Sequence, residues 1–169
     1  MTFLVKNAGI LRTTGSDNSK QGKRKLGFNF VSQEAWIASY PIMSNDVDNI
    51  NNCLQSPFVI CGYDPDTPEF DEYFPLSSFK YRLLIGIKDQ DNDTYHKNEV
   101  IYVLSYCGSI FDAKDKLIDL GCSASNIIML DGSDSSQMIA KDPDNSLAYQ
   151  FEFNKDARTI PQVIYVCNP

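Results

Sequence analysis

The residues with the clearest chemical potential lie in the segment Asp131-Gly132-Ser133-Asp134-Ser135-Ser136. This segment brings two carboxylates, three hydroxyls and one flexible backbone position together within six residues. Carboxylates can act as nucleophiles or general bases, and hydroxyls can donate and accept hydrogen bonds. Asp, Gly and Ser are also the commonest turn formers. The composition of the segment therefore leaves two interpretations, a functional site or an ordinary turn.

The elements before this segment explain how it would be positioned. Residues 127–130 form a short, continuous apolar run that predicts a buried strand, because the run is too short for a helix. Residues 109–120 are predicted to form an amphipathic helix, in which Ser109 and Asp112 resemble a capping box and Gly121 is the expected stop. The apolar face of this helix comprises Ile110, Ala113, Leu117 and Leu120.

Several other segments have the pattern of strands. They are two short strands around the turn 7–9, a hairpin of strands 26–31 and 35–40, a strand pair at 81–88 and 99–106, and single strands at 57–61, 147–153 and 162–167. Residues 44–52 have the features of a short capped helix. Because strands outnumber helices, we predict an α+β fold with a mixed, mostly antiparallel twisted sheet packed against one main helix at about 109–120.

Five of these segments, in this order and spacing, resemble the phosphodiester glycosidase family. The resemblance covers about residues 50–167, and more weakly residues 5–37. It is carried by Ser56-Pro57-Phe-Val-Ile-Cys-Gly62, by Tyr81-Arg82-Leu-Leu-Ile-Gly86-Ile87, by a helix ending in Leu120-Gly121, by a strand ending in Leu130-Asp131-Gly132 before Ser135-Ser136, and by Arg158-Thr-Ile-Pro161 before a last strand.

The chain departs from the family pattern at two places. Ser133 and Asp134 stand where the family usually has its second and third glycines. The family's amino-terminal segment of the type Asn-Gly-Gly-Phe-Phe has no counterpart in this chain. We therefore expect one domain over residues 1–169, shortened at the amino end relative to the family.

The resemblance implies a hydrolase that cleaves the glycosidic bond of a phosphodiester-linked sugar or a related cell-surface glycan. In such a site Arg82 and Arg158 would hold the phosphate, because the planar guanidinium grips phosphate oxygens bidentately. Asp131 would be nucleophile, base or electrostatic stabiliser, and Ser135, the third catalytic candidate, would donate a hydrogen bond to the phosphate or sugar. Ser136, Gly132 and Asp134 would contact the substrate. A helix following the serines would add positive potential at its amino end. Neither a metal nor a cofactor is implied.

Three alternatives remain open on the sequence alone. Arg82 and Asp131 could form a structural ion pair across neighbouring strands, and Arg158 could merely hold a loop in place. Asp134 could be a simple turn residue. The second function considered is therefore a non-catalytic carbohydrate-binding or interaction module on the same fold.

Composition and charge limit the partners. The chain has 169 residues, of which 43% are hydrophobic, which suits one domain with a substantial core. The net charge of -7 argues against a nucleic acid partner, because phosphate backbones require a basic surface. No run approaches the roughly 18 apolar residues of a membrane span, and the start lacks the pattern of a signal peptide. We expect a cytoplasmic protein or a fragment of an exported one.

The cysteines and the acidic loop at 89–98 give no indication of a metal site. The five cysteines, at positions 53, 61, 107, 122 and 167, lack Cys-x-x-Cys spacing, so buried free thiols are preferred to a zinc site or to disulfides. The series Asp89, Asp91 and Asp93 is similar to a calcium loop but has Thr94 and Val100 at the expected glycine and glutamate positions. His96 is expected to be exposed in the same polar loop.

Overall fold

The computed structural model of the chain describes residues 5–7, 10–13, 25–31, 34–40, 58–66, 80–92, 97, 99–130, 137–141 and 147–152. Within these ranges the strands are β1 (Val5–Asn7), β2 (Ile10–Thr13), β3 (Lys25–Val31), β4 (Glu34–Tyr40), β5 (Phe58–Tyr63), β6 (Lys80–Lys88), β7 (Val100–Gly108), β8 (Ile127–Met129), β9 (Gln137–Lys141) and β10 (Leu147–Glu152). The helices are α2 (Ile110–Asp119) and the single 3-10 turn η2 (Ala124–Asn126). No helix in the described ranges is long and apolar enough to cross a membrane.

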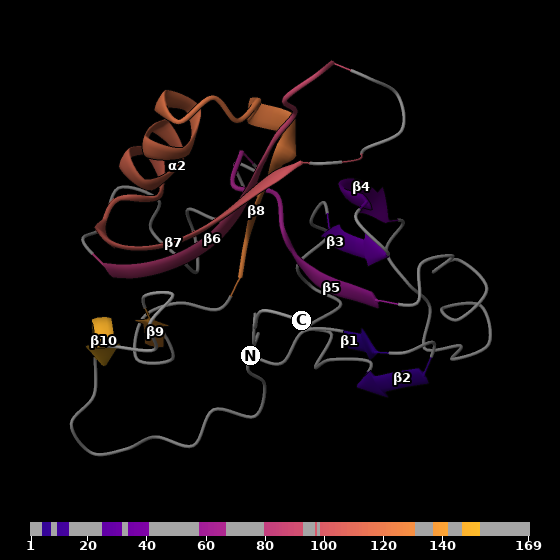
Figure 1. Ribbon diagram of the computed structural model, residues 1–169, viewed down its shortest axis with the longest axis horizontal. Coiled ribbons are helices and arrows are strands. Elements are labelled where there is room, and N and C mark those ends of the chain that lie inside the picture. Colours follow the sequence, from indigo (N-terminus) through magenta and orange to yellow (C-terminus); the bar gives the residue numbers. More distant parts are fainter. Residues whose placement is uncertain are drawn as a thin grey trace.

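Strands β1 to β8 form one sheet in which every described pairing is antiparallel. The main path runs β2-β1-β5-β8-β6-β7, and the hairpin β3–β4 joins it through β5. Strands β9 and β10 pair with each other in a separate two-stranded sheet (Figure 1). The described part is thus an α+β fold, as the sequence predicted, and its sheet is antiparallel throughout.

Strand β5 is the point at which the sheet divides. Strand β3 pairs along the length of β5, from Phe58 to Tyr63. Because a strand has two edges, β1 and β8 must share the other edge, and they do so at different heights: β1 pairs at Val59 and Ile60, whereas β8 pairs at Tyr63. Strand β8 therefore lies between β5 and β6, and its end approaches the place on β5 where β1 begins.

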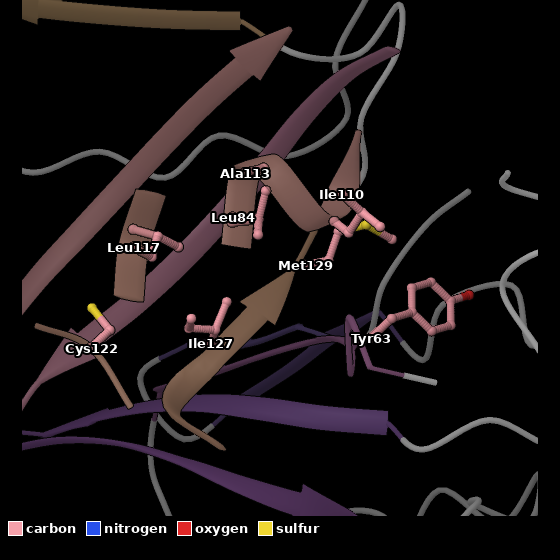
Figure 2. Packing of buried hydrophobic residues seen from close by; sticks show 8 residues of the cluster. All are labelled: Tyr63, Leu84, Ile110, Ala113, Leu117, Cys122, Ile127 and Met129. Atoms are coloured by element: carbon pink, nitrogen blue, oxygen red, sulfur yellow. The ribbon is translucent and has the colours of Figure 1, made fainter. Parts of the chain in front are cut away.

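The side of the sheet facing α2 carries the first of two hydrophobic clusters. Alternation along each strand sends every second side chain to this side. Figure 2 shows side chains of β6 and β8 meeting those of the helix. The buried members of this cluster are Tyr63, Leu84, Ile110, Ala113, Leu117, Cys122, Ile127 and Met129, and the half-buried Tyr102, Leu104 and Tyr106 of β7 pack against them.

Among the described elements, strand β4 packs against the opposite side of the sheet. Ala35 of β4 is buried together with Ile85 and Ile87 of β6, Ile128 of β8, and Leu130, which follows β8. An isolated antiparallel bridge joins Glu34 at the start of β4 to Lys97, just before β7, and their side chains lie 3.7 Å apart. The sheet therefore curls until its two ends approach each other around this second cluster.

Helix α2 begins and ends where its sequence predicts. Ser109 is its N-cap, and the Ser109 hydroxyl accepts a hydrogen bond of 3.0 Å from the backbone N–H of Asp112. At the other end, Gly121 has a positive φ of 98° and donates to the Ile118 carbonyl, while Cys122 donates to the Leu117 carbonyl. These two bonds form a Schellman motif, whose accompanying apolar contact is supplied by the buried Leu117 and Cys122.

Gly86 lets the helix and its C-terminal turn approach strand β6 closely. A β-carbon at this position would lie 2.8 Å from the Cys122 sulfur and 3.2 Å from both δ-carbons of Leu117. Any residue larger than glycine would push the end of α2 away from the sheet. Gly86 therefore sets the separation between the two layers at the middle of the first cluster.

The predicted elements are largely present with slightly different bounds. The strand pairs β1–β2, β3–β4 and β6–β7 and the strands β8 and β10 are confirmed. No helix follows Ser136 directly, the condition under which a helix amino end would have added positive potential, because β9 begins at Gln137 and pairs with β10. The helix expected at 44–52 and the strand expected at 162–167 lie outside the described residues.

The N-cap of α2 provides a first test. Replacement of Ser109 by Ala removes the acceptor for the Asp112 N–H, and we expect a loss of about 1 kcal/mol in the free energy of unfolding. Urea denaturation measures this loss. Ser123→Ala is the matched control, because Ser123 caps η2 without a side-chain cap hydrogen bond. An equal loss in both variants would contradict the assigned role of Ser109.

The close approach at Gly86 provides a second test. Gly86→Ala should lower the free energy of unfolding by about 1–3 kcal/mol, because its new methyl group overlaps the Cys122 sulfur. In a Cys122→Ala background the same substitution should cost less, since the overlapping sulfur is gone. A double-mutant cycle by chemical denaturation measures the coupling. Additive effects would show that the cysteine does not limit the layer separation.

Candidate functional site

Arg82 is the sequence-predicted site residue that the structure describes. It lies near the start of β6, on the side of the sheet that carries Leu84 and faces α2. Its partner in the β7 register is Tyr106, and the side chain of Arg82 is only 4% exposed. Burial lowers the pKa of the Arg82 guanidinium by removing water from around its charge. Even so, an arginine stays charged at neutral pH, so a buried positive charge is fixed at this end of the sheet.

Strand β8, which precedes the polar segment in the sequence, pairs with β6 close to Arg82. Its register with β6 pairs Met129 with Leu84 and Ile128 with Ile85. The alignment continues beyond the strand, because the Leu130 N–H donates a 2.8 Å hydrogen bond to the Leu83 carbonyl. Asp131 is bonded to Leu130, which restricts its α-carbon to about 3.8 Å from that of Leu130. Leu83 is bonded to Arg82, and its partner Leu130 is bonded to Asp131. The predicted carboxylate is therefore one residue away from the described pair Leu83–Leu130.

Several other elements meet at this end of the sheet. Strand β7 ends at Gly108 and passes directly into the capped start of α2. Tyr63, at the end of β5, lies in the same cluster as Ile110 of the helix. Beyond Tyr63, the chain turns through Asp66, whose carboxylate pairs with the ammonium group of Lys114. The Lys114 side chain is 13% exposed and that of Asp66 is 51% exposed, so we attribute to this ion pair orientation of the turn against α2 rather than substantial stability.

The remaining predicted site residues lie outside the described part of the chain. They are Asp131, Gly132, Asp134, Ser135, Ser136 and Arg158. The structure therefore places Arg82 near Leu130, the residue that precedes Asp131 in the sequence, and the arrangement of the other groups stays a prediction. Because β9 begins at Gln137, the helix that would follow Ser136 is not formed. The described helix amino end at this end of the sheet is that of α2.

The sequence did not identify Tyr63, Asp66 and Tyr106 as neighbours of this region. The strand pair at 81–88 and 99–106 was predicted, but its register was not, and only the register places Tyr106 opposite Arg82. An apolar alternation identifies the side of a strand to which a residue points without identifying its partner. The pairing of Asp66 with Lys114 joins residues 48 positions apart and leaves no local pattern.

The acidic loop after β6 is organised as a turn. The Asp89 side chain accepts hydrogen bonds from the backbone N–H groups of Asp91, at 3.2 Å, and Asn92, at 2.6 Å. Asn92 has a φ of 54°, a conformation that asparagine tolerates better than most residues. Within the described ranges no three His, Cys, Asp or Glu side chains are grouped so as to hold a metal ion. Asp93 and His96 lie outside these ranges.

The two described cysteines differ in their surroundings. Cys122 is a buried free thiol, as predicted, whereas Cys107 is a free thiol that is exposed, contrary to the prediction. Burial raises the pKa of the Cys122 thiol, and the nearby charge of Lys88 partly opposes this shift. The native state thus holds this proton more tightly than the unfolded chain. Its contribution to stability is complete below about pH 8.5 and is lost as the pH rises through the raised native pKa.

This difference predicts selective alkylation. Iodoacetamide should modify Cys107 quickly in the native protein, and Cys122 only after denaturation, because the thiolate must form and be reached. Lys114 and Lys116 lie between the two cysteines, so tryptic peptides separate them for mass spectrometry. Rapid native labelling of Cys122 would be incompatible with the Schellman turn packed on Gly86.

No model of a known protein family matches the chain, and no curated protein matches it significantly. The resemblance to the phosphodiester glycosidases therefore rests on the segments quoted from the sequence. The described residues add an α+β fold and the pairing of β6 with β8. Strand β6 contains Arg82, and β8 precedes the Asp131 segment in the sequence.

Proposed function

We propose that this protein is a hydrolase, similar to the phosphodiester glycosidases, that cleaves the bond between the anomeric carbon of a sugar and a phosphodiester. One observation carries the proposal. The β6–β8 register and the hydrogen bond from Leu130 to Leu83 align the chain so that the next residue pair would be Asp131 and Arg82. Such a reaction needs a cation to hold the phosphate and a carboxylate near the anomeric carbon, and Arg82 and Asp131 have these two chemical properties.

Arg82 suits the phosphate. A phosphodiester carries one negative charge on two non-bridging oxygens, which match the fork of a guanidinium. The surroundings of Arg82 are almost free of water, since its side chain is 4% exposed. Attraction between opposite charges is stronger in such an environment than in water. A buried guanidinium also requires polar or anionic partners, and a bound phosphate would be one of them.

Asp131 suits the sugar. If the antiparallel register continues by one residue, the β-carbons of Asp131 and Arg82 are about 4.5–5.5 Å apart and point to the same side of the sheet. A carboxylate there would lie beside the phosphate and therefore beside the anomeric carbon. It would act as nucleophile, base or electrostatic stabiliser of the positively charged centre. The phosphate leaves with the bonding electron pair and needs little help from a general acid.

The alternative is a carbohydrate-binding or interaction module that keeps the fold without the reaction. Two observations favour it. Ser133 and Asp134 replace glycines that would let the backbone approach a ligand. The deep burial of Arg82 also suits a purely structural ion pair with Asp131. The two functions differ in turnover, and the structural pair differs from both in its effect on stability.

Turnover of a diester that links N-acetylglucosamine to nitrophenyl phosphate tests the proposal. We expect release of free N-acetylglucosamine, measured by chromatography. Release of nitrophenolate alone would mean that the bond between phosphorus and the nitrophenyl oxygen is cleaved instead of the glycosidic bond. Asp131→Asn should lower the rate by about 10²–10⁴-fold, and Arg82→Lys by roughly 10²-fold through loss of the bidentate contact. Asp115→Asn, an exposed carboxylate on α2, is the matched control and should retain full activity.

Two further outcomes have a definite meaning. Binding of sugar phosphates in calorimetry without any turnover would replace the hydrolase with the binding module. Neither binding nor turnover by the wild type would overturn both. To separate catalysis from structure, the same variants are unfolded in urea. A structural ion pair predicts a loss of about 3–5 kcal/mol for Asp131→Asn, which removes one of the two charges, whereas the proposed catalytic role predicts rates that fall much further than stability.

A further inference from the structure

We draw no further inference here: the strongest candidate, the outer edge of strand β7, a nine-residue strand without a charged side chain that pairs with β6 alone among the described strands, carries nothing because nothing in the described part of the chain shows what covers that edge.

Discussion

Strand β6 is buried on both of its sides, and the arrangement of the other elements follows from that constraint. Leu84 points towards α2, while Ile85 and Ile87 point the other way, and all three are at most 2% exposed. Each such side chain contributes about 1.5–3 kcal/mol when it is removed from water. A strand of this kind needs a cover on each side. Helix α2 supplies one, and the curl of the sheet, which brings β4 back over β6, supplies the other.

Close backbone contact at two glycines makes this double cover compact. Gly86 admits the end of α2, and Gly62 of β5 admits β8, since a β-carbon at Gly62 would overlap the carbonyl oxygen of Met129. Strand β8 is consequently held between β5 and β6 over the three residues Ile127–Met129. Its last residue pairs with Tyr63 of β5 and with Leu84 of β6, at the place where the sheet divides.

The parts of this structure that the sequence predicted are those determined by neighbouring residues. Helix α2 is an example, because Ser109, the apolar period and Gly121 act within a few turns of chain. The parts it did not predict depend on distant partners. The bridge between Glu34 and Lys97, the sharing of one β5 edge by β1 and β8, and the exposure of Cys107 leave no trace in local alternation. Of the candidate site, the sequence identified Arg82 but not its depth of burial or its neighbour Tyr106.

Two interpretations of the buried Arg82 are a structural ion pair with Asp131 and a phosphate-binding role, and the two are compatible. A guanidinium has five N–H donors, and a carboxylate held bidentately uses two of them. An ion pair with Asp131 would therefore keep Arg82 oriented without ligand and would engage two of these donors. Such a pair would also keep the carboxylate charged and in place, which reduces the reorganisation that a substrate must induce. Under the proposed function, such a pair near the start of β6 would hold Arg82 and the carboxylate in place before the substrate binds.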